Sequence, residues 1–360
     1  MFGNETEVMT IASWFLVVGL CSLLGWVYLL AWHSGFWRVK PKLDRLPRDS
    51  TKPLPEVVAV VPARNEVAHV SEALRSLLGQ TYAGRLSVIL VDDHSDDLTR
   101  RIAQSVGASS GRSLRVISAS PLPPGWSGKL WAVAAGLEHA REHFPDARYV
   151  LLTDADIAHD RANLARLIAK AEADQLDLVS LMVRLHCTYF WERLLIPAFV
   201  FFFRKLYPFQ AVNQRARKVA AAAGGCMLVR REALERVGGI ESIHDQLIDD
   251  VALGAQLKHQ PRAHTGRIWL GHTDRTVSLR QQPRLCDLWA MVVRCADKQL
   301  GHSLPMLALT VVGMLVLYIW PVVAVFSWSS IGQPALVLLG SIIWLSIGLA
   351  YWPTVRLYRL

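Results

Sequence analysis

The sequence predicts an α/β domain with a mostly parallel sheet and helices on both faces, joined to about three transmembrane helices and to amphipathic helices at the membrane surface. Three observations lead to this prediction. Short apolar runs alternate with helical patterns between Pro55 and about His272. Long segments without charge lie near both ends of the chain. Hydrophobic residues make up 52% of the 360 residues, more than an ordinary soluble enzyme carries.

The expected strands and helices follow one another in a regular order. Apolar or β-branched runs predict strands over residues 57–61, 86–91, 114–117, 149–153, 178–185 and 227–229. Apolar residues at helical spacing predict helices over residues 71–78, 98–106, 129–143 and 163–173. Ligands in sheets of this kind bind at the carboxyl ends of the strands, so polar motifs at those ends are candidates for function.

The first transmembrane helix is predicted over residues 10–32, which contain no charged residue. A helix needs about 20 apolar residues to cross the hydrocarbon core. Glu5 and Glu7 precede this segment and no basic residue does, which argues against a cleaved signal peptide. Basic residues such as Arg38 and Lys40 follow it, so the positive-inside rule places the N-terminus outside and the following residues in the cytoplasm.

Two further spans are predicted near the C-terminus, over residues 304–328 and 334–351, with a turn around Gly332 between them. Two spans return the chain to the side on which it started. The tail agrees, because Arg356 and Arg359 are basic residues of the kind that stay in the cytoplasm.

Two other apolar segments are predicted to lie on the membrane surface. Residues 194–210 are apolar and aromatic, but Arg204 and Lys205 interrupt them, so an interfacial helix is favoured over a span. A buried hydrophobic helix is the alternative. Residues 285–299 predict a second surface helix. The expected domains are a transmembrane helix with a basic linker (1–54), a cytoplasmic domain (55–280) with an interfacial insertion (190–213), an interfacial helix (281–303), and a transmembrane hairpin with a basic tail (304–360).

Charge and cysteine content narrow the class of partner. The formal net charge is +9, and the basic residues lie beside apolar segments rather than in a run with interleaved aromatics. We therefore expect contact with an anionic membrane surface and no nucleic-acid partner. The five cysteines include no Cys-x-x-Cys pair, and their number is odd, which argues against a disulfide framework or a zinc cluster.

Asp154 and Asp156 directly follow the predicted strand 149–153. In an extended chain, residues two apart share a face, so their carboxylates repel unless a positive charge lies between them. Hard oxygen ligands suit Mg²⁺ or Mn²⁺, which also binds the phosphates of a nucleoside diphosphate. The motif therefore predicts a divalent metal site. The alternative is a solvated turn in which Asp156 caps a helix.

Asp92 and Asp93 close the predicted strand 86–91. A carboxylate at this place can accept hydrogen bonds from a pyrimidine edge or from ribose hydroxyl groups. Asp96 follows in the same loop, and for this residue a simple role as the cap of the next helix is favoured. The pair therefore predicts a nucleoside contact.

Asp249 and Asp250 begin a predicted helix that is rich in small and apolar residues. Either they provide favourable negative charge at the N-terminus of the helix, or one of them is a general base for a hydroxyl group. Gly224 and Gly225 form a small-residue loop before the strand 227–229. Their backbone could approach a substrate closely, and tight packing is an equally simple explanation.

Taken in order, these motifs resemble those of the family-two inverting glycosyltransferases, which have the Rossmann-like GT-A fold. The resemblance extends over about residues 55–301, and its opening stretch from Val60 to Glu66 is similar to the first nucleotide-binding strand and loop of the family. It implies that Asp154 and Asp156 hold the metal and that Asp250 is the base, with Asp249 in the place of the family's Glu. It also implies donor-binding roles for Pro62, Arg64, Glu66, Asp92, Asp93, Lys129, Asp154 and Gly225.

One motif departs from the family pattern. Membrane-bound relatives often carry Gln-x-x-Arg-Trp on an interfacial helix near the donor or acceptor. Here Gln281 and Arg284 have this spacing, but Leu285 replaces the Trp. Arg294, inside the predicted surface helix 285–299, is the other candidate and is preferred. A generic basic anchor at the membrane surface is the alternative for both arginines.

Several stretches resemble more closely the hopanoid-biosynthesis-associated branch of this family, namely residues 124–131, 178–183, 195–200 and 222–228. This similarity implies a multi-pass protein of the bacterial inner membrane that glycosylates a hopanoid or a related polyprenyl or terpenoid lipid.

The expected function is thus the inverting transfer of a sugar from a nucleotide sugar, UDP-linked by preference, to a lipid acceptor. A processive polysaccharide synthase is one alternative, but about three spans are too few to thread a polymer through a monomer. A non-catalytic membrane scaffold is the other, and it gives no reason for the crowded carboxylates.

Overall fold

The computed structural model describes residues 3–43, 53–244, 249–259, 266–299, 303–327 and 333–360. The turn at Gly332 lies outside this part, as do Arg45 and Arg48, two further basic residues after the first predicted span, and the side chains of Asp249 and Cys295. The chain divides into two compact units. The sheet unit contains Lys40–Ile196 and Phe209–Leu285, and the helical unit contains Met1–Val39, Pro197–Pro208 and Cys286–Leu360.

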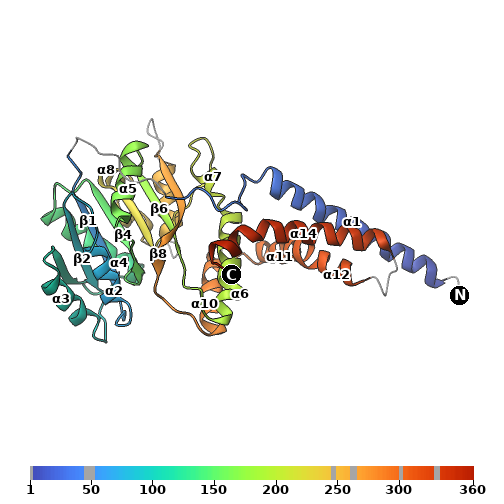
Figure 1. The fold of residues 1–360 in the computed structure, drawn as a ribbon, viewed down its shortest axis with the longest axis horizontal. Helices are drawn as coiled ribbons and strands as arrows, with labels where there is room; N and C mark the ends of the chain where they lie inside the picture. The colour runs from blue at the N-terminus through green and yellow to red at the C-terminus, as the bar shows by residue number, and fades with distance from the viewer. Residues whose placement is uncertain (1–2, 44–52, 245–248, 260–265, 300–302, 328–332) are drawn as a thin grey trace. The chain divides into compact units, whose positions relative to one another are not determined.

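One sheet of eight strands forms the centre of the sheet unit (Figure 1). Its order is β3 (Leu114–Ser118), β2 (Leu86–Asp92), β1 (Val57–Ala63), β4 (Tyr149–Thr153), β7 (Cys226–Arg230), β6 (Leu178–Arg184), β8 (Ile268–Ser278) and β5 (Ile157–Ala158). The first four strands are mutually parallel. Strand β7 is antiparallel to β4 and β6, β8 is parallel to β6, and β5 is antiparallel to β8.

The sheet is therefore mixed, and the prediction of a mostly parallel sheet is right for its first four strands and for the pair β6–β8, but wrong for β7 and for the edge strand β5. The reason is physical. Strand β7 is buried over nearly its whole length, and a buried strand has the same continuous apolar pattern in either direction. Two strands were also missed. Strand β5 has only two residues, and β8 contains polar residues such as Thr273, Asp274 and Arg275 that break an apolar run.

The predicted helices of the sheet unit are confirmed, with ends shifted by a few residues at most. They are α2 (Val70–Leu78), α3 (Thr99–Ser110), α4 (Gly128–His143) and α5 (Asn163–Ala173). Shorter helices, α7 (Phe209–Val212), α8 (Arg231–Arg236) and η1 (Ile240–Ile243), precede α9 (Asp249–Lys258). The main core contains buried side chains of α2, α3 and α5, packed on the face of β1 that includes Val57, Ala59 and Val61.

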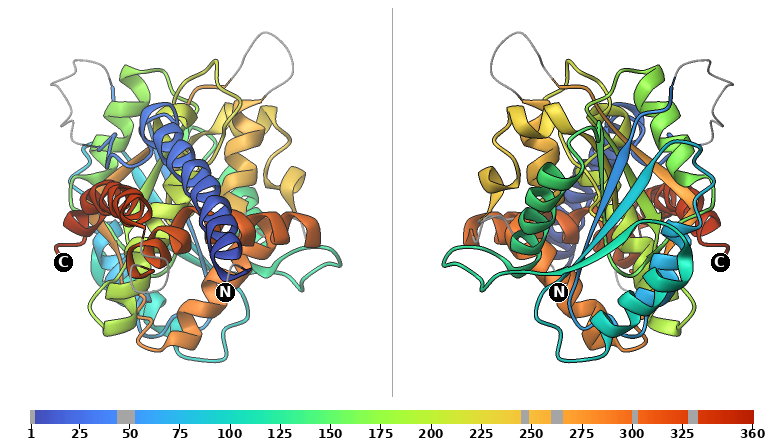
Figure 2. Two further views of the ribbon diagram at one scale, coloured as in Figure 1. Left: turned by 90° about the vertical axis from the view of Figure 1, so that its right-hand side faces the viewer. Right: turned by 90° about the vertical axis from the view of Figure 1, so that its left-hand side faces the viewer.

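Helix α4 covers the opposite face of the sheet. The two views in Figure 2 show α4 on one side of the strands and α3 on the other. Successive strand residues point to opposite faces, so Val60 and Val91 face α4 while their neighbours face the main core. Gly136 makes the close approach possible, because a Cβ atom at this position would lie 2.4 Å from Val60 Cγ1. The sheet is thus covered on both faces, as predicted.

The helical unit consists of long apolar helices. They are α1 (Gly3–Ala31), α11 (Leu304–Met314), a π-helical turn η2 (Leu315–Ile319), α12 (Trp320–Phe326) and α14 (Pro334–Leu357). Helix α6 (Phe190–Leu206) contributes its second half and α10 (Leu285–Gln299) nearly its whole length. The core of this unit includes Trp26, Phe201, Trp320 and Ile343, from four different helices.

Among the residues that the structure describes, four helices are long and apolar enough to cross a membrane: Ser13–Ala31, Phe190–Val212, Leu304–Phe326 and Pro334–Leu357. Three of them coincide with the predicted spans. The fourth is the segment for which the sequence predicted a surface helix, and that placement stays a prediction.

The two basic residues that interrupt this fourth segment have partners inside the helical unit. Arg204 is 1% exposed and donates to Thr354 Oγ1 and to the Trp37 carbonyl, the latter at 3.4 Å. Lys205 Nζ donates to the Tyr318 hydroxyl at 3.2 Å. Both residues therefore hold helices of the unit together.

Candidate functional site

The parallel half of the sheet brings the predicted motifs together at one edge. The register pairs Ala63 with Asp92 and Val60 with Leu152, so β1, β2 and β4 end at about the same level. Asp92 is the last residue of β2, and Asp154 is the first residue after β4. The expectation that the acidic motifs follow the carboxyl ends of strands is confirmed.

Lys129 pairs with the first carboxylate of the predicted metal motif. Its Nζ lies 2.9 Å from Asp154 Oδ1, and both side chains are partly exposed. Lys129 is placed by the N-terminus of α4, where Ser127 caps the helix by accepting a hydrogen bond from the backbone N–H of Leu130 at 3.3 Å.

Arg280 pairs with the second carboxylate. Its Nε lies 2.8 Å from Asp156 Oδ2, and its guanidinium group also binds Glu66 Oε1. Burial raises the pKa of Glu66, as do the neighbouring carboxylates, while Arg280 opposes this shift. Arg280 was not among the site residues predicted from the sequence. Its position immediately before the Gln281 motif was the available signal, but a contact across 124 residues leaves no trace in the local pattern.

These two ion pairs modify the argument for a metal. The positive charge that the adjacent carboxylates require is supplied here by Lys129 and Arg280, so repulsion alone does not demand a metal ion. The donor set still fits Mg²⁺ or Mn²⁺, because Asp154 and Asp156 offer hard carboxylate oxygens. The alternative of Asp156 as a helix cap finds no support, since its hydrogen-bond partners among the described residues, Leu279 and Arg280, are on the segment after β8.

Asp93 is buried, and its carboxylate lies near the side chains of Arg64 and His94 and near the start of α4. Arg64 Nη1 is 3.6 Å from Asp93 Oδ2, and His94 Nδ1 is 3.4 Å from Asp93 Oδ1. A Cβ atom on Gly128 would lie only 2.7 Å from Asp93 Oδ2, so the start of α4 fits closely against this carboxylate. Asp92 Oδ1 is buried and has no hydrogen-bond partner among the residues that the structure describes.

The loops after β1 and β2 are tied to each other. The Asn65 backbone N–H donates to Ser95 Oγ at 3.0 Å, and Asn65 Oδ1 accepts from the Asp96 backbone N–H at 2.9 Å. The expectation that Asp96 caps the next helix is wrong. The cap position of α3 is Leu98, whose side chain makes no capping bond, and Asp97 Oδ1 accepts from the backbone N–H of Thr99, the first residue of α3, at 2.8 Å.

Asp250 lies against the small-residue loop that precedes β7. The backbone N–H of Gly224 donates to Asp250 Oδ2 at 2.7 Å, and Val251 N–H donates to Asp250 Oδ1 at 2.8 Å. A Cβ atom on Gly224 would lie 3.4 Å from Asp250 Oδ2 and 3.6 Å from Lys129 Nζ. Gly224 thus separates the predicted base from the lysine that holds Asp154.

A cavity opens among these elements. Its polar lining includes Lys129, Thr153, Asp154 and Gly224, together with Pro62. Apolar side chains complete the wall: Leu130, Val133, Leu152, Met227, Ile240, Ile243 and Leu253. Three of the predicted donor-binding residues, Pro62, Lys129 and Asp154, therefore border one cavity. Gly225 instead packs tightly, since a Cβ there would lie 3.1 Å from Val183 Cγ2, which favours the packing explanation for this residue.

A buried chain of hydrogen bonds supports the strand end beneath the cavity. Asn163 Nδ2 donates to His159 Nδ1 at 3.0 Å, so the ring proton is on Nε2, which donates to Thr153 Oγ1 at 3.0 Å. The Thr153 hydroxyl in turn donates to the Gly225 carbonyl at 2.8 Å. Burial lowers the pKa of His159 to about 4, so this imidazole is neutral near pH 7.

The Gln281 motif is held by a buried acid at the start of α6. Glu192 is 0% exposed, and its Oε1 accepts the backbone N–H of Gln282 at 2.6 Å. Arg284 is exposed in the sheet unit, and Arg294 is exposed in the helical unit. Which of the two serves the site stays a prediction.

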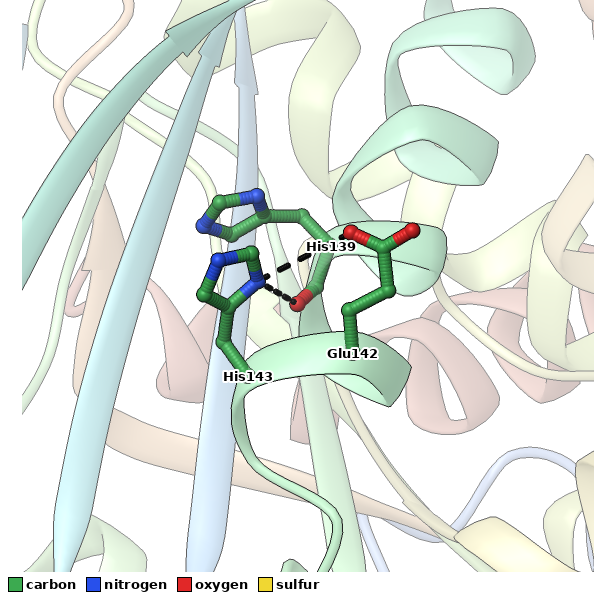
Figure 3. Close-up of side chains that lie close together, drawn as sticks. All are labelled: His139, Glu142 and His143. Atoms are coloured by element: carbon green, nitrogen blue, oxygen red, sulfur yellow. Dashed lines mark hydrogen bonds and ion pairs between the residues drawn. The ribbon is translucent and has the colours of Figure 1, made fainter.

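One other group of possible metal ligands occurs among the described residues. His139, Glu142 and His143 lie on the last turn of α4, with their ligand atoms within 4.8 Å of one another (Figure 3). Ten residues of helix separate His139 from Lys129, a rise of about 15 Å toward the other end of α4. Arg115 Nη1 also lies 3.4 Å from His139 Nε2 and would repel a cation. This group is therefore not part of the cavity site.

The chain is similar to known glycosyltransferases. The family model of glycosyl transferase family 2 matches residues 58–238, just over half of the chain. No curated protein matches the sequence.

Among solved structures, the mannosyltransferase PcManGT from Pyrobaculum calidifontis, in complex with GDP-Man and Mn2+, is 20% identical, with 98% of this chain and 96% of that chain covered and a TM-score of 0.56. This similarity shows a shared fold. S. aureus TarS 1–349 in complex with UDP-GlcNAc is 17% identical over 64% of this chain and 60% of that chain, with a TM-score of 0.42. Mannosyl-3-phosphoglycerate synthase from Rubrobacter xylanophilus is 22% identical over 68% and 74%, with a TM-score of 0.40. Neither of these two scores is high enough to carry an argument.

Proposed function

Because the chain belongs to glycosyl transferase family 2, we propose that this transferase moves a sugar from a nucleotide-sugar donor to a hydroxyl group of a membrane lipid, with inversion at the anomeric carbon. One observation carries the proposal. Lys129, Asp154 and Gly224 come from three separate parts of the chain and line one cavity, and Asp250 is hydrogen-bonded to the Gly224 backbone at its edge.

In this proposal the nucleotide lies along the ends of β1 and β2. The buried, unpartnered Oδ1 of Asp92 would be stabilised by a donor from the base or ribose, because an unsatisfied buried acceptor is costly. Asp93, held by Arg64, would orient the nucleoside beside Pro62. Lys129, at the N-terminus of α4, would face the diphosphate together with the partial positive charge of that helix end.

Asp154 and Asp156 would hold Mg²⁺ or Mn²⁺. When bound, such a cation neutralises the charge that develops on the departing nucleoside diphosphate. The Mn2+ and GDP-Man in the structurally similar PcManGT support this assignment. They also require that GDP-sugars be tested beside the UDP-sugars that the sequence favours.

Asp250 would accept the proton of the acceptor hydroxyl as that oxygen attacks the anomeric carbon from the face opposite to the diphosphate. The hydrogen bond from the Gly224 N–H fixes Asp250 Oδ2 at 2.7 Å, and Val251 N–H fixes Oδ1 at 2.8 Å. The carboxylate is therefore already oriented without a substrate, which lowers the entropic cost of proton transfer.

The acceptor would be a lipid, with a hopanoid or a related terpenoid as the first choice from the sequence resemblance. Support comes from the helical unit, whose described helices include segments long and apolar enough to cross a membrane. A lipid that diffuses in the bilayer could present its hydroxyl group at the membrane surface.

The test uses the full-length protein in membranes or detergent, with labelled UDP- and GDP-sugars, Mn²⁺, and extracted lipids as acceptors. Asp250→Asn should lower transfer by at least about a hundredfold, which is the lower range for loss of a general base, while donor binding is kept. Asp146→Asn is the matched control, because Asp146 is an exposed aspartate before the amino end of β4, and this variant should retain transfer. Chelation of the metal should abolish transfer by the wild type.

Full activity of Asp250→Asn would refute the assignment of the base. Activity that is indifferent to chelators would refute the metal. Mass spectrometry of the product separates a lipid carrying one sugar from a polymer, so a long product would favour the polysaccharide synthase instead.

A further inference from the structure

Arg280 covers two buried carboxylates at the predicted metal site. Its side chain is 46% exposed, whereas those of Asp156 and Glu66 are 11% and 14% exposed. The guanidinium group binds both of them and lies on their solvent side. Arg280 is thus an exposed cation paired with two carboxylates that are mostly buried, rather than a deeply buried structural ion pair.

The backbone that carries Arg280 is fixed independently of this side chain. The segment pairs with β5 through Ile157 and Ser278, and Leu279 N–H donates to the Asp156 carbonyl at 2.8 Å. On the other side, Gln282 N–H donates to Glu192 at 2.6 Å. The guanidinium group can therefore leave Asp156 by rotation of the side chain, without unfolding of the strand.

From this arrangement we infer that Arg280 is an internal counter-ion that occupies Asp156 when no donor is present and so makes binding of the divalent cation depend on the diphosphate of the donor. The inference rests on the proposed function. A free cation must compete with the guanidinium group for Asp156 and is repelled by its charge. A nucleoside diphosphate brings negative charge that balances both the cation and Arg280.

The size of the effect follows from Coulomb's law. A dication and a guanidinium group about 5 Å apart repel each other even at the dielectric constant of water, and more strongly beside buried carboxylates. Removal of the charge of Arg280 should tighten the binding of the cation alone by about tenfold or more. The tightening caused by a nucleoside diphosphate should shrink by a similar factor, because the diphosphate no longer has the positive charge of Arg280 to balance.

The experiment measures Mn²⁺ binding to the full-length protein in detergent, from the electron paramagnetic resonance signal of free Mn²⁺. Each variant is titrated with Mn²⁺ alone and again with UDP or GDP present. Arg280→Gln is expected to bind Mn²⁺ alone about tenfold tighter than the wild type. Arg275→Gln is the matched control, because Arg275 is an exposed cation on β8, and this variant should bind like the wild type.

Arg280→Lys provides a second variant in case Arg280→Gln does not fold. An ammonium group lacks the fork that lets Arg280 bind two carboxylates, so Mn²⁺ alone should bind about threefold tighter than to the wild type. If the wild type binds Mn²⁺ with nucleotide present, but the folded Arg280 variants bind Mn²⁺ alone no more tightly than the wild type does, the inference about Arg280 is overturned and the proposed function is not. If no variant and no wild type binds Mn²⁺ even with nucleotide present, the metal of the proposed function fails as well.

Discussion

The buried imidazole of His159 should make the protein sensitive to acid well above the usual range of carboxylates. Burial lowers the pKa of His159 from 6.5 to about 4, so below pH 6.5 the unfolded chain takes up a proton that the native protein refuses. Stability is therefore complete above pH 6.5 and falls as the pH decreases, until the native imidazole also titrates near pH 4. Over this whole pH range the free energy of unfolding falls by about 3 kcal/mol, at about 1.4 kcal/mol for each pKa unit.

The substitution that isolates this effect is His159→Gln. A glutamine side chain can accept from Asn163 and donate to Thr153, as the neutral imidazole does, but it takes up no proton. Between pH 7.5 and pH 5, the wild type should lose about 2 kcal/mol more than this variant. For a domain of this size, that loss is a difference of about 4–8 °C in the unfolding temperature.

The assay is thermal unfolding of the full-length protein in detergent, followed by intrinsic tryptophan fluorescence at several pH values. His143→Gln is the control, because His143 is partly exposed at the end of α4 and should leave the pH profile of the wild type unchanged. A constant offset between the wild type and His159→Gln is of no consequence, since only the slope is compared. Parallel loss of stability in both proteins would refute the reasoning from burial.

Three further substitutions test the packing around the site. Gly128→Ala should weaken nucleotide binding by about tenfold in a titration, because the new Cβ would lie 2.7 Å from Asp93 Oδ2; wild-type affinity would contradict this. Gly136→Ala should lower stability by about 1–3 kcal/mol, because its Cβ would lie 2.4 Å from Val60 Cγ1, and an unchanged unfolding temperature would disprove the close contact. Glu192→Gln should cost about 1–3 kcal/mol in the same assay, because an amide nitrogen replaces one of two buried acceptor oxygens; a neutral effect would count against this network.

Local pattern determined much of the sheet unit in advance. The strands and helices from β1 to α5, apart from the two-residue strand β5, follow from alternation of apolar runs and helical spacing, because both periods are set by neighbouring residues. The same reasoning placed Asp92 and Asp154 after strands, and parallel strands necessarily bring their carboxyl ends to one edge. Long uncharged segments likewise identified three helices of the helical unit, since apolar length is a local property.

The site needed more than these patterns, because its essential contacts join residues far apart in the sequence. Arg280 meets Asp156 across 124 residues, and Glu192 meets the Gln282 backbone across 90. Periodicity states which face of a strand is buried, but it does not state which distant side chain arrives there. The sequence therefore predicted that a metal ion balances the charge of Asp154 and Asp156. In the folded chain, Lys129 and Arg280 also supply positive charge to these carboxylates.

Strand direction was likewise decided only by the tertiary structure. Strand β7 reads as a buried apolar run in either direction, and its antiparallel place between β4 and β6 follows from the path of the chain before it. That reversal begins β7 directly after Gly225, and it places the Gly224 backbone against Asp250. The sequence alone thus predicted most of the candidate site residues, because residue type and spacing are local. Only the folded chain decided which of them meet, because meeting depends on strand order and direction.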